Sequence, residues 1–387
     1  MTETFDRLAF APEEYLARRD ALRALMTERG IAAVVLTTTE NTYYLTGFGS
    51  LAYGATALVM RADGKAVWVM RRTELSNIRA LADQLWANEG LGVTDGQVHA
   101  EVLEGAIADL VGTNAVIGVE FSAVQPILRG FLGPLGSGRK IVDATGLVEH
   151  LRRIKSPAEI ALLKQAGAIA AQSCRDGFAA LHEGMTDSAL AVAVTDSLLR
   201  NGSGRMAQMP NVCAGPRTAR AHVTWCGAPI RRADVINIEP AASIHDYHTP
   251  IYRIYSLGPP LDVVRRMFDA CRQALDEGYA RVRPGMTSHE AARIFESVIE
   301  KAGFAENMVT RPAYSIGAAF PPGWGEDSVV AIRQNSEQVL EEGMCFHVVP
   351  CLYMDGVGCV PASMPSVLTA KGFEPLADDE VVLAIKD

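Results

Sequence analysis

The chain has 387 residues, and 36 Lys and Arg against 45 Asp and Glu residues give a net charge of −9. An acidic chain lacks the excess of basic side chains that neutralises phosphates, so we expect no nucleic-acid partner. With 49% hydrophobic and 21% charged residues, the composition is typical of a folded globular protein rather than a disordered or fibrous chain. The length suggests about two or three domains.

The sequence predicts neither a membrane helix nor a secretory signal. No run approaches the roughly 18 to 20 apolar residues that a membrane helix needs. The first 18 residues carry four acidic side chains, whereas a signal peptide has a basic stretch followed by an apolar one. The seven cysteines form no Cys-x-x-Cys pair, which favours a reducing compartment. We therefore expect a cytoplasmic protein with no membrane partner.

The N-terminal part of the chain alternates between helical and strand-like patterns. Residues 12–29 carry apolar side chains at helical spacing. Short apolar runs that follow are predicted strands, at residues 32–36, 66–70 and 115–119. This order predicts an α/β domain.

A strong helix start marks the boundary between two predicted domains. Ser156 can cap a helix, Pro157 fits its first turn, and Glu159 lies three residues after the cap. The alternating pattern ends shortly before this point. We predict one domain over residues 1–146 and a second over residues 147–387.

The second domain contains a weak internal repeat, a feature typical of duplicated folds. The string Gly-Met-Thr occurs at residues 184–186 and again at 285–287, and each copy opens a predicted helix that stops at Gly202 or Gly303. A long helical stretch precedes each copy, and strand-like segments follow it. The repeat predicts a pseudo-twofold domain with a site between its halves.

Strings spread over nearly the whole chain carry a family resemblance, at residues 14–19, 41–47, 153–159, 247–250, 313–317 and 321–326. In order and spacing they resemble the pita-bread superfamily of methionine aminopeptidases, prolidases and creatinase, and most of all its creatinase and ectoine hydrolase branch. The resemblance implies an α/β (α+β) protein, with a creatinase-type N-terminal domain and a pita-bread domain. It also implies a homodimer in which Tyr53 or Trp68 reaches a neighbour's pocket.

Metallopeptidases of this superfamily hold two metal ions with two Asp, one His and two Glu. The resemblance places these ligand positions on residues of other types, at Ala241, Tyr252, Tyr314, Val349 and Ser363 or Met364. Alanine, valine and tyrosine side chains do not replace the carboxylates and imidazole of a dinuclear site. We therefore predict no metal ion and no other cofactor.

The resemblance to creatinase places that family's catalytic histidine at His222. An imidazole can accept or donate a proton near neutral pH, as water activation and protonation of a leaving nitrogen both require. A structural histidine at the start of a strand is the alternative. A nucleophilic Cys213 or Cys226 beside His222 is conceivable, but buried structural cysteines are favoured.

Two carboxylates complete the predicted catalytic set. Glu239 closes the apolar run 235–238, where an unpaired carboxylate is expensive to bury, so a functional role is favoured. Asp246 and His248 would share one face of an extended strand, and Asp246 could then orient an imidazole or hold a cation. A solvated hairpin tip, or a mononuclear metal site with His245, are the alternatives for this segment.

We thus predict His222, Glu239 and Asp246 as catalytic residues. The predicted substrate-binding residues are His248, Tyr252, Tyr314, Trp324, Glu326, His347 and Tyr53. The resemblance implies a metal-independent hydrolase of a C–N bond in a small polar cyclic amidine, guanidine or amide, similar to ectoine. Alternatives are a lyase or isomerase, or a small-molecule-binding protein without activity. The expected partners are this small molecule and a second copy of the chain.

The positions of creatinase's two carboxylate-binding arginines fall on Gly54 and on Trp324 or Gly325. A bidentate carboxylate clamp has no neutral substitute, so creatine is disfavoured as a substrate. With carboxylates predicted near His222, we expect a substrate that carries positive charge.

Overall fold

The computed structural model describes residues 8–50, 56–112, 114–123 and 139–387. The chain divides into two compact units, residues 1–152 and 153–387. This division lies slightly after the predicted boundary at residue 146, because α5 (Leu147–Arg152) packs against α1 (Pro12–Glu28) of the first unit. No helix in the described ranges is long and apolar enough to span a membrane.

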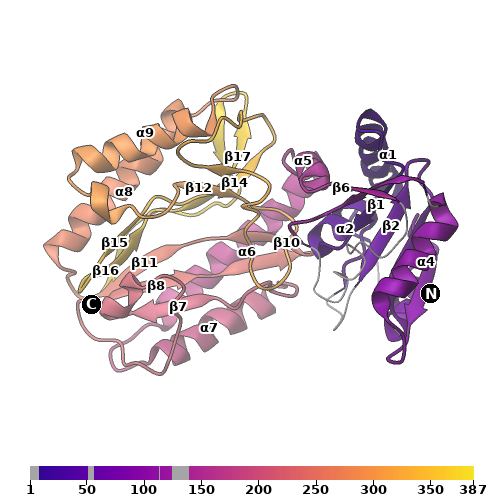
Figure 1. Ribbon diagram of the computed structural model, residues 1–387. Coiled ribbons are helices and arrows are strands. Elements are labelled where there is room, and N and C mark those ends of the chain that lie inside the picture. Colours follow the sequence, from indigo (N-terminus) through magenta and orange to yellow (C-terminus); the bar gives the residue numbers. More distant parts are fainter. Residues whose placement is uncertain (1–7, 51–55, 113, 124–138) are drawn as a thin grey trace. The chain divides into compact units, whose positions relative to one another are not determined.

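The first unit is a mixed six-stranded sheet covered by helices (Figure 1). Its strands follow the order β4-β3-β2-β1-β5-β6. Their bounds are β1 Ala33–Leu36, β2 Ala57–Arg61, β3 Ala66–Arg71, β4 Gly90–Val93, β5 Val116–Val119 and β6 Lys140–Asp143. The other helices are α2 Thr39–Thr46, α3 Leu75–Ala80 and α4 His99–Val111.

Both faces of this sheet are buried. Val34 and Leu36 of β1 pack into one hydrophobic cluster, while Ala33 and Val35 pack into another. A strand buried on both faces is continuously apolar, which explains why these strands appear in the sequence as short apolar runs. Trp68 is fully buried in the first cluster and donates a hydrogen bond from Nε1 to the Ala87 carbonyl at 2.9 Å, so the expectation that it reaches a neighbour's pocket is wrong.

The second unit has its long helices on the outside and its strands between them (Figure 1). The helices are α6 Pro157–Ala180, α7 Asp187–Arg200, α8 Asp262–Arg281 and α9 Ser288–Lys301. One sheet has the order β19-β11-β8-β7 and the other the order β13-β12-β14-β17-β18. Two further strand pairs, β9 with β10 and β15 with β16, connect successive strands of these sheets.

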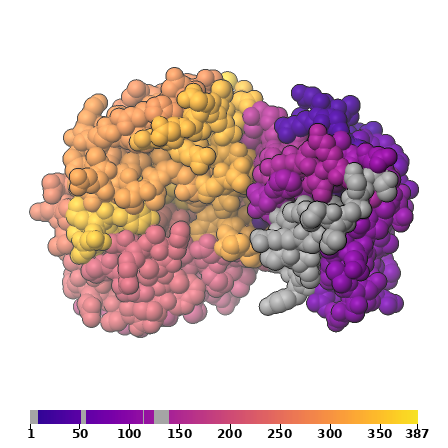
Figure 2. Space-filling view, in the orientation of Figure 1, coloured from indigo at the N-terminus to yellow at the C-terminus, as the bar shows by residue number. Residues whose placement is uncertain are grey.

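The strand bounds of the second unit follow the internal repeat. In the first half they are β7 Asn211–Ala214, β8 Val235–Glu239, β9 Ala241–Ile244, β10 Tyr247–Pro250 and β11 Arg253–Leu257. In the second half they are β12 Ala313–Ser315, β13 Ala331–Ile332, β14 Cys345–Val348, β15 Cys351–Met354, β16 Gly358–Pro361, β17 Met364–Thr369 and β18 Gly372–Pro375, and β19 Ala384–Lys386 returns to the first sheet. The space-filling view shows the orange second half above the pink first half (Figure 2).

The predicted helix starts are confirmed. Ser156 and Glu159 form a capping box at the start of α6, with Ser156 accepting from the Glu159 amide at 3.2 Å. Thr186 caps α7, and Thr287 caps α9 with a full capping box. The Gly-Met-Thr repeat therefore marks two equivalent helix N-termini, one in each half.

Candidate active site

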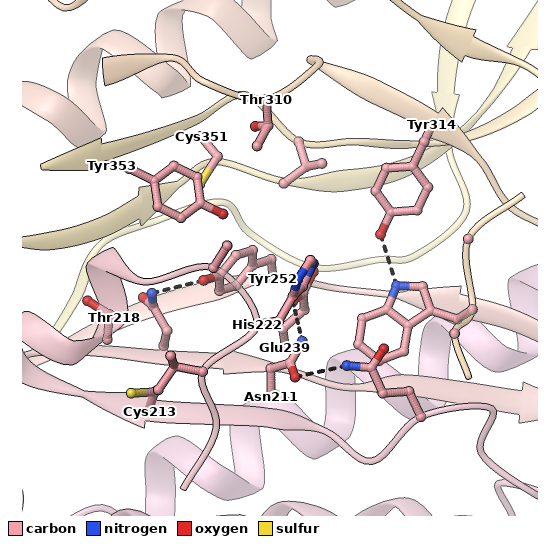
Figure 3. Close-up of a pocket in the computed structure, with 18 of the residues that line it drawn as sticks. Asn211, Cys213, Thr218, His222, Glu239, Tyr252, Thr310, Tyr314, Cys351 and Tyr353 are labelled. Carbon is pink, nitrogen blue, oxygen red and sulfur yellow. Dashed lines mark hydrogen bonds between the residues drawn. The ribbon is translucent and has the colours of Figure 1, made fainter. Parts of the chain in front are cut away.

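A cavity of about 230 Å³ opens between the two halves of the second unit. The first half contributes Asn211, His222 and Glu239 to its wall, and the second half contributes Tyr314 and Trp324 (Figure 3). A space of this size can hold a small metabolite. This position between the two halves agrees with the position predicted from the internal repeat.

Glu239 ends β8 at the wall of this cavity. Its Oε2 accepts a hydrogen bond from Asn211 Nδ2 at 3.0 Å, and Asn211 in turn accepts one from Gln208 Nε2 at 3.0 Å (Figure 3). Burial raises the pKa of Glu239 from 4.5 to about 7, against the opposing effect of the Asn211 hydrogen bond. None of the described residues forms an ion pair with it. This carboxyl group can therefore gain or lose a proton near neutral pH.

His222 lines the same cavity from a turn rather than from a strand. Its backbone φ is 57°, a left-handed conformation that residues other than glycine rarely adopt. Conformations of this kind are costly and occur where the surrounding structure imposes them, often at functional sites. The structure thus brings two of the three predicted catalytic residues, His222 and Glu239, to one cavity.

Tyr314 lies at the centre of a buried chain of hydrogen bonds on the other side of the cavity. Its hydroxyl accepts a hydrogen bond from Trp324 Nε1 at 2.9 Å (Figure 3). The same hydroxyl lies 2.8 Å from His347 Nδ1. The other ring nitrogen of His347 lies 2.8 Å from Ser363 Oγ. Burial raises the pKa of Tyr314 well above its usual value and lowers that of His347 to about 3, so both side chains are neutral at ordinary pH.

Tyr252 and His347 have different relations to the cavity. Tyr252 lines it, with its hydroxyl 2.9 Å from Asn237 Nδ2 and 3.4 Å from Cys359 Sγ. His347 is fully buried behind Tyr314 and does not line the wall, so its predicted contact with substrate is corrected to an indirect one through Tyr314.

The residues present do not fit the dinuclear metal centre of metallopeptidases. Both ring nitrogens of His347 are occupied by Tyr314 and Ser363, and Val349 presents only carbon to the cavity. Within the described ranges, no three His, Cys, Asp or Glu side chains are grouped so that they could hold a metal ion. The chemistry considered below therefore uses the protein's own side chains.

Asp246 and His248 do not reach the cavity, which corrects their predicted roles there. Asp246 and His245 form the tip of the β9–β10 hairpin with φ of 57° and 48°, so the alternation of an extended strand does not apply. Asp246 pairs with Arg205 at 2.9 Å. His248 is buried, with Nε2 accepting from the Ala207 amide at 3.0 Å and Nδ1 donating to the Asp246 carbonyl at 2.9 Å.

Burial also lowers the pKa of His248 to about 4, which keeps this histidine neutral in a structural role. Glu326 is likewise structural: it is buried in an ion pair with Lys155 at 2.7 Å and also accepts from Ser315 Oγ at 3.1 Å. Tyr53 lies outside the described residues.

The cavity wall contains polar residues that the sequence did not reveal. Asn211 lies directly opposite Glu239 in the β7–β8 register, so a predicted strand pairing would have found it. Arg220 and Arg311 also line the cavity, and no local pattern indicated either. Arg311 pairs with Asp327 and lies over the Tyr314 ring, 4.7 Å from its centroid.

The cysteines offer no activated nucleophile at this wall. Cys213 lines the cavity, but burial raises the pKa of its thiol and so disfavours the thiolate. Cys226 is exposed and lies outside the wall. Cys351 also lines the cavity, and burial likewise raises the pKa of its thiol. The prediction that most cysteines are buried is confirmed, since Cys226 alone of the seven is exposed.

Residues 161–365 match metallopeptidase family M24, and residues 18–154 match the creatinase/prolidase N-terminal domain. The chain therefore belongs to metallopeptidase family M24, with the pita-bread fold and the N-terminal domain that the sequence predicted. It is 27% identical to an ectoine hydrolase of Halomonas elongata, over 98% of this chain and 99% of the relative.

Solved structures agree with this assignment. A prolidase from Thermococcus sibiricus superposes with a TM-score of 0.86 at 19% identity, over 96% of this chain and 99% of that one. Dipeptidase PepE from Mycobacterium ulcerans superposes with a TM-score of 0.83 at 25% identity, over 97% of this chain and 99% of that one. The named relatives are hydrolases, of ectoine in one case and of peptides in the others.

Proposed function

We propose that the chain is a metal-independent hydrolase that cleaves a C–N bond in a small polar cyclic amidine, guanidine or amide similar to ectoine. The observation that carries this proposal is the pairing, in one metabolite-sized cavity, of His222 with a carboxyl group, Glu239, whose pKa is about 7. The likeness to an ectoine hydrolase supports the substrate class.

In the proposed reaction, His222 removes a proton from water as the water oxygen attacks the carbon of the C–N bond. The imidazolium then returns this proton to the leaving nitrogen as the bond breaks, so His222 ends the cycle neutral. A positively charged amidinium or guanidinium beside Glu239 favours its carboxylate form, which stabilises that charge. Tyr252 and Tyr314 line the opposite walls and limit water around the reacting carbon.

The charge of the cavity wall narrows the substrate further. Glu239 offers a partner for a cation, while Arg220 offers a partner for an anion; Arg311 already pairs with Asp327. Arg220 is exposed, and none of the described residues forms an ion pair with it. We therefore propose a zwitterionic substrate that carries a carboxylate as well as a basic nitrogen. This narrows the expectation of a substrate that carries positive charge.

The proposal is tested by turnover of ectoine, guanidino acids and cyclic amides after treatment of the protein with EDTA. We expect undiminished hydrolysis of one such compound, its loss in H222A, and incorporation of oxygen-18 from labelled water. Stabilisation by a compound that remains unchanged would instead identify a binding protein, and turnover without oxygen-18 a lyase or isomerase. Loss of activity with EDTA that zinc or manganese restores would contradict metal independence.

We also propose a homodimer, as the family resemblance implies. Size-exclusion chromatography with light scattering tests it: a mass near twice the 41.6 kDa of the chain is expected, and a monomer would contradict it.

A further inference from the structure

The loop that carries His222 is held by one buried carboxylate. Asp187 is the first residue of α7 and is fully buried. Its Oδ1 accepts hydrogen bonds from three successive backbone amides, those of Cys226 at 3.1 Å, Gly227 at 2.9 Å and Ala228 at 3.0 Å. The Asp187 amide also donates to the Ala228 carbonyl at 2.9 Å. Residues 226–228 are thereby fixed to the end of the helix.

The second carboxylate oxygen fixes the same loop from its other side. Arg217, in the short helix Gly215–Ala219, lies 2.8 Å from Asp187 Oδ2 and donates from Nη2 to the Thr224 carbonyl at 2.9 Å. The chain from Arg217 to Ala228 is therefore attached to Asp187 before and after His222. Hydrogen bonds to a buried charged group are stronger than those between neutral groups.

His222 depends on this attachment for its position. No described residue forms a hydrogen bond with its imidazole, so the position of the ring at the cavity wall depends strongly on the path of the backbone. That path includes the left-handed conformation of His222 itself, which persists only where the surrounding structure imposes it. A release of residues 224–228 would let the loop relax and move the imidazole.

The equivalent residue of the second half holds its loop differently. Ser288 begins α9 as Asp187 begins α7, and its hydroxyl contacts only the backbone of Ala331 and Arg333, donating to the Ala331 carbonyl at 2.7 Å and accepting from the Arg333 amide at 2.9 Å. The carboxylate clamp is thus confined to the half that carries the histidine.

We infer that Asp187 is a positioning residue that holds His222 in its working position. The kinetic part of this inference rests on the proposed function, whereas the structural part does not. A displacement of about 1 Å in a reacting group lowers rates by about 100-fold. Loss of the clamp should therefore lower kcat, and it should also raise KM for a substrate that carries a carboxylate, because Arg220 lies in the same loop as His222.

The test compares D187A and D187N with the matched control S288A, which removes the equivalent contact in the other half. Hydrogen exchange of the amides of residues 226–228 should rise at least tenfold in D187A and stay unchanged in S288A. Diethyl pyrocarbonate modifies accessible histidines, and mass spectrometry measures the rate at His222 relative to exposed His182. We expect this relative rate to change at least twofold in D187A and to stay the same in S288A. With ectoine as the probe, kcat should fall about 100-fold in D187A.

D187N separates the two parts of the clamp, because its amide oxygen can still accept from residues 226–228 but its charge is lost. Relative to D187A, we expect D187N to have a higher kcat and slower amide exchange at residues 226–228. If D187A does not fold, D187N alone tests whether Asp187 positions His222. Unchanged exchange and His222 modification in a folded Asp187 variant would overturn the inference even if H222A abolishes hydrolysis. If wild-type protein leaves ectoine intact, the proposed function fails for that substrate, while exchange and modification still decide the role of Asp187.

Discussion

The two halves of the pita-bread unit share one backbone plan and differ in the side chains that face the cavity. The Ile230 amide donates to the Met185 carbonyl and the Leu340 amide to the Met286 carbonyl, both at 2.8 Å. The pattern repeats after β8 in the first half and after β14 in the second, where the carbonyls of Pro240 and Pro350 each accept a hydrogen bond of 3.0 Å. The duplication thus preserves main-chain geometry that does not depend on the side chains.

The side chains at equivalent positions in and behind the cavity wall have diverged. In the first half Asn237 donates to Tyr252 at 2.9 Å, and in the second His347 contacts Ser363 at 2.8 Å. Glu239, just before Pro240, is matched by apolar Val349 just before Pro350. The second half therefore satisfies its polar groups internally, while the first retains an ionisable carboxyl group. A symmetric scaffold here carries an asymmetric site.

The largest effect should come from the glycines at which the long helix of each half meets its partner. Gly177 and Gly278 each lie seven residues before the Gly-Met-Thr string, and they face Val194 and Phe295 at the same position of α7 and α9. A methyl group on Gly177 would meet Val194 Cγ2 at 2.8 Å, whereas one on Gly278 would enter the fully buried Phe295 ring.

Because overpacking a rigid ring is harder to relieve, we expect G278A to lower the free energy of unfolding by about 3 kcal/mol and G177A by about 1 kcal/mol. Urea denaturation of both variants measures the difference. Equal losses would show that the two helix contacts are equivalent despite their different partners.

Glu239 provides the next largest effect, through pH. Its pKa is raised from 4.5 to about 7, so the folded state keeps a proton that the unfolded state releases, and the contribution of this group to stability is lost as pH rises from about 4.5 to 7. Glutamine does not titrate. The stability of E239Q relative to wild type should therefore increase over this range, by up to about 3 kcal/mol.

Thermal unfolding between pH 4 and pH 8 measures this change, with V349Q as the control at the equivalent position of the other half. If the difference in stability between E239Q and wild type does not change with pH, the pKa of Glu239 is not raised. The two halves would then not differ by a carboxyl group that titrates near neutral pH.

Features that depend on neighbouring residues in the sequence could be predicted, whereas contacts between side chains on different strands could not. The helix starts at Ser156, Thr186 and Thr287 depend on side chains within three residues and were predicted from the sequence. Asp246 was misplaced because two turn residues with positive φ end the strand alternation. His347 lies beside Tyr314 because β14 pairs with β12 in a register that places these two residues opposite each other, and this register could not be predicted from the sequence.

A smaller effect should follow from a backbone difference between the halves. Ala233 has a φ of 65° where the second half has Gly343 with a φ of 88°. The Ala233 amide donates to Leu257 of β11 at 2.7 Å, and the Gly343 amide donates to Leu368 of β17 at 2.8 Å. A left-handed alanine costs about 1–2 kcal/mol, of which the greater entropy of unfolded glycine offsets part. We expect A233G to stabilise the protein by about 0.5–1 kcal/mol.

The reciprocal change, G343A, should destabilise, and more strongly, because the added methyl group would also meet Ile154 Cγ2 at 2.9 Å. Chemical denaturation of the pair checks both signs. Destabilisation by A233G would mean that the Ala233 side chain makes contacts that outweigh its backbone strain.

The smallest expected difference lies in the helix caps. Thr287 belongs to a capping box in which the Glu290 carboxylate accepts a hydrogen bond from the Thr287 amide at 2.8 Å, whereas Thr186 caps α7 through its own side chain alone. Loss of a capping threonine costs about 0.5–2 kcal/mol. Since T287A also removes the hydroxyl that holds the Glu290 carboxylate at 3.1 Å, it should destabilise by about 1 kcal/mol and T186A by about half as much. Urea denaturation of the two single variants and the double variant measures the loss in the free energy of unfolding for each. A larger loss in T186A than in T287A would contradict the prediction and show that the stronger cap lies in the half that contains His222.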